Sequence, residues 1–145
     1  MKSLIIAFTL LLSVATTSVF AAEKAVSPLV LKSFNNTFNT ATQVAWTVTE
    51  SFYKATFEIN GQYVTAFYLS DGSMAAVTRN ISRAQLPVTL QADLAKYPDM
   101  WLSDLFELTT ENNTQYYITL ENGTDKVVLK SASNLSWTAY QKEKK

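Results

Sequence analysis

One tetrapeptide has a spacing known from nucleophilic catalysis. Ser51-Phe52-Tyr53-Lys54 places a hydroxyl three residues before an amine. In penicillin-binding enzymes the Ser-x-x-Lys spacing works because a helix brings both groups to one side. Here the segment is predicted to be the start of a strand, in which residues three apart point to opposite faces. The Ser-Asp-Asn and Lys-Thr-Gly partners are also missing from the sequence, so no catalysis is expected at this motif.

The acidic residues do not form an acid-base pair either. Asp99, Asp104 and Glu107 are the loose carboxylate group of the chain. A general acid needs burial or a charged neighbour to shift its pKa, yet Asp104 and Glu107 lie three apart in a predicted strand and so on opposite faces. The loops 111–113 and 121–125 have too few oxygen ligands for a dedicated calcium site. We predict no catalytic residue and no metal site.

Composition narrows the functional classes further. The 145 residues include no Cys and no His, which excludes thiolate and Ser-His nucleophiles, disulfides, and nearly all zinc and copper sites. Twelve basic residues balance twelve acidic ones, so no long-range field attracts nucleic acid or an anionic membrane. The chemistry predicts no cofactor and no nucleic-acid partner, and the length suits one domain.

The N-terminus has the pattern of a secretory signal peptide. Lys2 precedes an apolar run over residues 4–14, and Val19-Phe20-Ala21 forms a small-residue cleavage site. This run is short of the roughly 20 apolar residues that span a membrane. We therefore predict a signal peptide at 1–21 and a single domain at 22–145. That domain would be periplasmic or secreted, with no membrane contact after cleavage.

Two helices and several hairpins must position the remaining side chains. Ser27-Pro28 predicts the start of a helix, and a second apolar stripe over residues 86–97 predicts another, ended by Pro98. All three glycines lie in hairpin-type pairs, namely Asn60-Gly61, Asp71-Gly72 and Asn122-Gly123.

The first of these turns predicts a register. If Asn60 and Gly61 are the two turn residues, opposed residues share a face of the sheet. The pairs Ile59–Gln62, Phe57–Val64, Ala55–Ala66 and Tyr53–Tyr68 then form an apolar core face. The same counting about Asn122-Gly123 pairs Ile118 with Val127 and Tyr116 with Leu129.

The opposite face of the first hairpin is the candidate binding surface. In this register Phe52 faces Leu69, Lys54 faces Phe67, and Glu58 faces Tyr63. Each aromatic can present about 150 Å², and two or three together reach the size at which an exposed patch indicates a partner. The predicted partner-binding residues are Phe52, Lys54, Glu58, Tyr63 and Phe67. A loop, the C-terminal strand or a dimer mate covering this face is the competing explanation.

The two halves of the chain share one order of elements. Residues 27–82 and 86–141 each read as a helix followed by antiparallel strands, with matching Asn-Gly turns about 60 residues apart. A unit this short could hardly bury its own sheet face. We therefore predict an α+β fold in which two tandem halves form one antiparallel sheet with both helices on one face.

These residues resemble a known family. The motifs are Phe34, Phe38, Val44-Ala45-Trp46, Tyr53-Lys54-Ala55-Thr56-Phe57, Asn60-Gly61, Ala66-Phe67-Tyr68, Asp71-Gly72, Leu86-Pro87 and Tyr97-Pro98. Together they are similar to the PepSY-like, beta-lactamase-inhibitor-like periplasmic proteins of Bacteroidota. Asn39 stands where that family usually has proline after the first helix. The resemblance implies an exported α+β protein without established catalysis, related in shape to modules that inhibit or regulate secreted enzymes.

Three functions remain open at this point. The first is a non-catalytic binding or inhibitory module of the bacterial envelope that holds a protein or peptide on the outer sheet face. The second is a small-ligand carrier or enzyme of cystatin-like or NTF2-like shape, with an inner pocket lined by Tyr53, Tyr68 and Tyr116. The third is a homodimer joined through the outer face.

Overall fold

The computed structural model describes residues 25–145, and the predicted signal peptide lies outside that range. The described elements are two α-helices and eight strands. They are α1 (Pro28–Thr37), β1 (Thr42–Val48), β2 (Tyr53–Ile59), β3 (Gln62–Tyr68), β4 (Met74–Asn80), α2 (Val88–Asp93), β5 (Trp101–Thr109), β6 (Thr114–Glu121), β7 (Asp125–Ser133) and β8 (Ser136–Lys144). Within the described range, no helix has the length and apolarity needed to cross a membrane.

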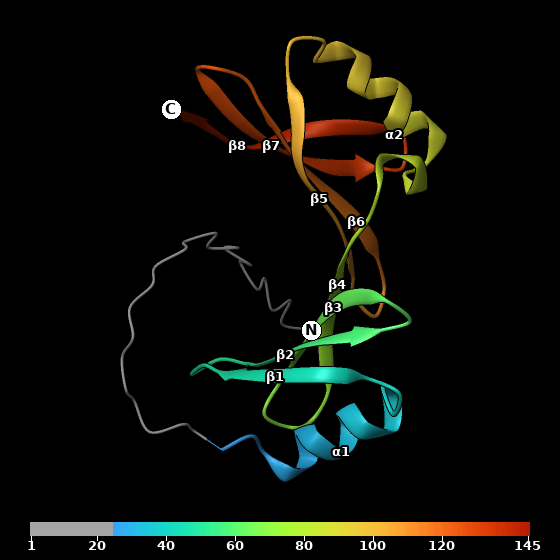
Figure 1. Cartoon of the computed structure of the whole chain (residues 1–145), viewed down its shortest axis with the longest axis vertical. Coiled ribbons are helices and arrows are strands. Elements are labelled where there is room, and N and C mark those ends of the chain that lie inside the picture. Colours follow the sequence, from blue (N-terminus) through green and yellow to red (C-terminus); the bar gives the residue numbers. More distant parts are fainter. Residues whose placement is uncertain (1–24) are drawn as a thin grey trace, which may run out of the picture.

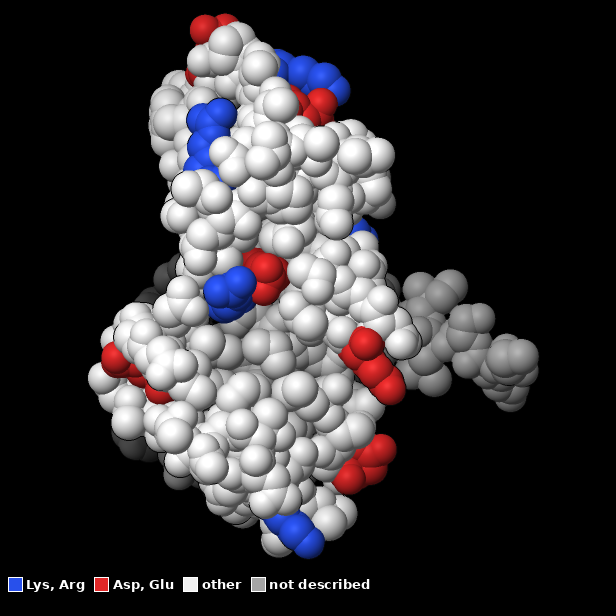
Figure 2. Space-filling model, turned by 90° about the vertical axis from the view of Figure 1, so that its right-hand side faces the viewer, with Lys and Arg blue, Asp and Glu red and all other residues white. Residues whose placement is uncertain are grey.

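All eight strands form one antiparallel sheet, in which each strand lies beside its neighbours in the sequence from β1 to β8. The predicted α+β class with an antiparallel sheet is therefore confirmed. The molecule is elongated, with α1 at one end and α2 at the other (Figure 1). Seen from the side, the surface narrows between two lobes, and charged side chains are sparse on this face (Figure 2).

Each helix has its own apolar core. Val30 and Phe34 of α1 pack among Phe57, Ala66 and Tyr68, and the Phe34 ring meets the edge of Phe57 with centroids 5.1 Å apart. The start of this helix at Pro28 is as predicted, because proline lacks the N–H that a first helical turn leaves unpaired.

The second core lies under α2, where Leu90 and Leu94 pack against Leu105, Ile118 and Leu129. The α-helix itself is only six residues long, and a turn of 3-10 helix (Leu94–Lys96) extends its C-terminal end, while another 3-10 turn (Arg83–Gln85) precedes it by two extended residues. Leu90 also accepts a hydrogen bond on its backbone oxygen from the buried indole Nε1 of Trp137, at 2.9 Å.

Register places both helices on the same face of the sheet. Ala66 pairs with Val77, and Val77 pairs with Thr109. Strand β5 has no bulge between Leu105 and Thr109, so Leu105 points the same way as Ala66. We call this side the helix face. The other side, the outer face, is defined by Lys54, Thr65, Phe67, Thr78, Leu108, Tyr117 and Lys130.

The register predicted for the first hairpin is confirmed. Seven consecutive pairs run from Tyr53–Tyr68 to Ile59–Gln62. Asn60 and Gly61 both have positive φ, at 51° and 75°, which is the backbone of the two-residue turn that favours Asn-Gly.

The register predicted for the hairpin at Asn122-Gly123 is wrong by two residues. Ile118 pairs with Leu129 and Glu121 pairs with Lys126, and the N–H of Asn122 donates to the Asp125 carbonyl at 3.0 Å, so the turn centres on Gly123 and Thr124, one residue later than predicted. Asn122 Oδ1 accepts hydrogen bonds from the N–H groups of Thr124 and Asp125, at 2.9 and 2.8 Å. The Asn122 side chain thus accepts the bond that its own carbonyl would accept in an ordinary tight turn. Because the error is an even number, the apolar side chains stay on the helix face.

Candidate functional site

The outer face carries a small apolar cluster of its own. Phe67, Ala76 and Leu108 are buried there, and Phe52 and Tyr117 pack against them. All of these residues belong to the sheet or to its first turn. Within residues 25–145, neither helix covers this face, because the register places both on the other side.

The five predicted binding residues differ in accessibility. Tyr63 is 63% exposed, whereas Phe67 is only 8% exposed. Phe52 is half-buried and meets the Phe67 ring edge-on, with centroids 5.6 Å apart. Lys54 and Glu58 are half-buried beside these rings. Phe67 thus forms the buried base of this surface, and Tyr63 is its most exposed aromatic residue.

Glu58 is held in place from the neighbouring edge strand. Its Oε2 accepts a hydrogen bond of 2.7 Å from Gln43 Nε2. Gln43 has a positive φ of 53°, and the ladder between β1 and β2 is irregular between Thr42 and Ala45. This bulge turns the Gln43 amide towards Glu58, which orients the carboxylate on the outer face.

The structure extends the surface beyond the first hairpin. Asn80 pairs with Phe106, and Phe106 pairs with Tyr117. The rings of Phe106 and Tyr117 are stacked, with centroids 5.1 Å apart, and Tyr140 meets Tyr117 edge-on at 5.5 Å. The Nζ atom of Lys130 lies 5.8 Å from the centre of the Tyr117 ring.

Strand alternation alone places Tyr117 and Lys130 on the outer face. Their relation to the first hairpin could not be predicted from the sequence, because the two hairpins meet through the pairing of β4 with β5. Helix α2 lies between β4 and β5 in the sequence, so no turn residue predicts that these two strands pair.

The polar side chains offer no acid-base pair. Arg79 Nε donates to Glu107 Oε1 at 2.9 Å on the helix face, while Asp104 Oδ1 accepts from Asn80 Nδ2 at 3.0 Å on the outer face. The prediction that Asp104 and Glu107 point to opposite faces is confirmed. No group of three acidic residues suited to a metal ion occurs among residues 25–145.

The phenols of the alternative hypothesis do not converge on one pocket. Tyr53 and Tyr68 belong to the core under α1, and Tyr116 packs against the core under α2. Burial raises the pKa of Tyr68 to about 12 and also raises the pKa of Tyr116. Both phenols therefore keep their protons at neutral pH.

No protein-family model matches this chain, and no curated protein matches it either. Solved structures of the same fold come from Bacteroides. A Bacteroides eggerthii protein assigned to the periplasm has a TM-score of 0.74 at 12% identity, covering 83% of this chain and 90% of its own. A BLIP-like protein of Bacteroides fragilis has a TM-score of 0.71 at 16% identity, covering 85% and 89%.

A DUF2874 family protein of Bacteroides uniformis has a TM-score of 0.73 at 13% identity, with coverage of 83% and 90%. The resemblance predicted from the aromatic and turn motifs is thus confirmed at the level of shape. This chain has the fold of the BLIP-like and periplasmic Bacteroides structures.

Proposed function

We propose that this protein is a non-catalytic module of the bacterial envelope that binds a protein or peptide on its outer face. The observation that carries this proposal is the aromatic surface on a sheet face that neither helix covers. Aromatic side chains supply large contact areas at small entropic cost, and they are enriched where binding energy is concentrated. An inhibitory or regulatory role towards an enzyme fits such a surface, because binding alone would be sufficient.

In the proposed complex, Tyr63 and Phe52 are the anchors and Phe67 supports them from below. Tyr63 exposes most of its area, and the edge-on contact with Phe67 limits the motion of Phe52. Lys54 and Glu58 flank the anchors and would select a partner of complementary charge. Tyr117 and Lys130 would extend the contact into the second hairpin.

Export is part of this proposal. The signal-peptide pattern at 1–21 supports it, and a structure of the same fold is assigned to the periplasm. We also infer that residues 27–82 and 86–141 are two similar halves, each a helix followed by four strands. Two such halves side by side would explain why the sheet is long enough to offer one continuous outer face.

The test is affinity capture from an envelope extract with matched variants. The double variant Phe52→Ser/Tyr63→Ser removes the accessible anchors and leaves the buried Phe67 in place. The control Leu29→Ser/Val88→Ser removes two apolar side chains that are 59% and 79% exposed on the helices. We expect partners of the native protein to be lost with the first variant and kept with the second. Equal recovery with all three proteins would refute the proposal.

A homodimer through the same face is the competing outcome. It would double the mass measured by light scattering in dilute solution, and the Phe52→Ser/Tyr63→Ser variant would return to the monomer mass. A monomer that binds a partner supports the module, whereas a stable dimer without other partners replaces it.

A further inference from the structure

The sheet splits open at one end of the hairpin formed by β5 and β6. On one side, the ladder between β4 and β5 ends at Val77–Thr109. On the other side, the ladder between β6 and β7 ends at Tyr117–Lys130. Just beyond that pair, the backbone N–H of Tyr116 donates to the side-chain Oγ of Ser131 in β7, at 2.9 Å, instead of to a backbone carbonyl of that strand.

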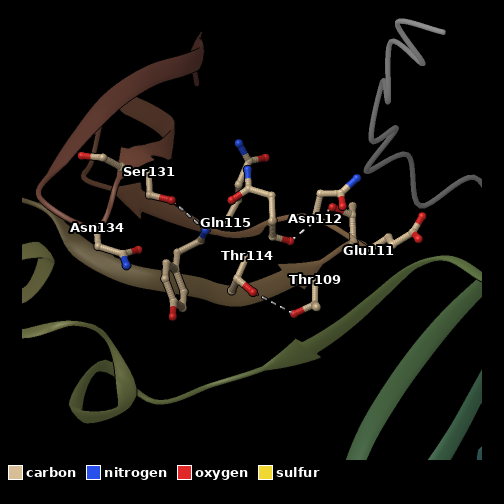
Figure 3. Close-up of a pocket in the computed structure, with 11 residues that line it drawn as sticks. Thr109, Glu111, Asn112, Thr114, Gln115, Ser131 and Asn134 are labelled. Atoms are coloured by element: carbon tan, nitrogen blue, oxygen red, sulfur yellow. Dashed lines mark hydrogen bonds between the residues drawn. The ribbon is translucent and has the colours of Figure 1, made fainter. Parts of the chain in front are cut away.

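A hollow of about 560 Å³ occupies the split between β6 and β7. Figure 3 shows Ser131 and Asn134 on one side of it, Glu111 and Asn112 on the other, and Thr114 and Gln115 between them. The size lies within the roughly 300–1,000 Å³ typical of small-molecule sites. The turn after β5 and the turn after β7 form its two walls.

The lining is polar and almost uncharged. Its side-chain amides belong to Asn112, Asn113, Gln115 and Asn134, and none of them makes a hydrogen bond within residues 25–145. Neighbouring hydroxyls do find partners, as Thr110 Oγ1 donates to the Asn113 carbonyl at 3.2 Å. Each amide offers two hydrogen-bond donors and an acceptor. Donors and acceptors without a protein partner therefore line the hollow.

Backbone groups add to this set. The tight turn pairs Thr110 with Asn113, and the N–H of Tyr116 points towards β7. Alternation along an antiparallel strand then turns the N–H and C=O of Thr114 towards β7 as well. The ladder to β7 does not reach Thr114, so these groups also face the hollow.

Charge and shape indicate the class of ligand. Glu111 is the one lining residue that carries a charge at neutral pH, and the nearby Arg79 is already paired with Glu107. A phosphate would find no cation among the lining residues, and an apolar ligand would find few apolar atoms. Hydroxyl groups, each both donor and acceptor, match the amides, and Tyr116 is the one aromatic residue of the lining.

We propose that this hollow is a binding site for a neutral oligosaccharide of disaccharide size. The site uses none of the five predicted binding residues of the outer face.

The test is titration of the purified, ¹⁵N-labelled protein with cellobiose, maltose and N,N′-diacetylchitobiose, each in turn, followed by NMR. We expect saturable shifts of the backbone amides of residues 109–116 and 131–136 with at least one sugar, and unchanged signals from Lys54, Glu58 and Tyr63. Binding that shifts only outer-face signals, or no saturable shift with any of the three sugars, would overturn the proposal.

A variant tests the role of the amides. Asn112→Ala/Gln115→Ala/Asn134→Ala is expected to weaken sugar binding at least tenfold. The control Asn35→Ala/Asn36→Ala removes two exposed amides from α1 and is expected to leave binding within twofold. Circular dichroism verifies that both variants are folded. Sugar binding that survives the triple change would assign the NMR shifts to some other group and overturn the proposed recognition.

Discussion

Replacing Tyr68 with phenylalanine is expected to stabilise this protein. The Tyr68 side chain is fully buried in the core under α1, and its hydroxyl has no hydrogen-bond partner within residues 25–145. A buried polar group without a partner costs about 1–3 kcal/mol, because its bonds to water are lost and not replaced. Removing the oxygen forfeits only a few tenths of a kcal/mol of dispersion contacts. The net gain in the free energy of unfolding is therefore about 1 kcal/mol.

The pH dependence supplies an independent measurement. Burial raises the pKa of Tyr68 from 10.0 to about 12, so above pH 10 the unfolded phenol ionises while the folded one keeps its proton. The difference in pKa contributes fully to the free energy of unfolding below pH 10. About 2 kcal/mol of that free energy is lost as the pH rises to 12. The Tyr68→Phe variant lacks this loss. Its advantage over the native protein should therefore grow between pH 10 and pH 12.

Urea unfolding at pH 7, 10 and 12 measures both effects. The control is Tyr63→Phe, which removes a hydroxyl from an exposed residue and should leave stability within a few tenths of a kcal/mol. A Tyr68→Phe variant less stable than the native protein by 1 kcal/mol or more at pH 7 would refute the reasoning. The hydroxyl would then have a partner in solution, such as a buried water.

Four further changes test the turns and the second core. Gly72→Ala should destabilise the protein by about 2–3 kcal/mol in urea unfolding, because φ is +87° and the new Cβ would lie 3.1 Å from a backbone oxygen of α1. Gly61→Ala, at φ +75° in open space, should cost only about 1 kcal/mol. Trp137→Phe should cost about 2–3 kcal/mol, because it removes a buried hydrogen bond and leaves a void. Finally, hydrogen bonds from Ser73 lower the pKa of Asp71. The pKa of Asp71, measured by NMR titration, should therefore be higher in Ser73→Ala, and the stability of the turn should depend less on pH in acid.

Local chemistry determined the features that depend on neighbouring residues. Asn60-Gly61 specified a two-residue turn because both residues tolerate positive φ, and that turn alone placed Phe57 and Val64 in the core. Pro28 marked the start of α1 for an equally local reason. Period-two alternation was sufficient to assign faces even in the second hairpin, where the turn lies one residue later than predicted.

Contacts between distant segments decided the rest. Tyr63 and Phe67 lie on the same face of β3, yet Tyr63 is 63% exposed and Phe67 only 8%. The reason is that Phe67 lies inside the sheet beside Phe52 and Ala76. The joining of β4 with β5 created the long outer face, and the parting of β6 from β7 opened the polar hollow. Both features depend on how far a ladder of backbone hydrogen bonds continues. Twist and packing across the whole sheet determine that length, and no short stretch of residues encodes it.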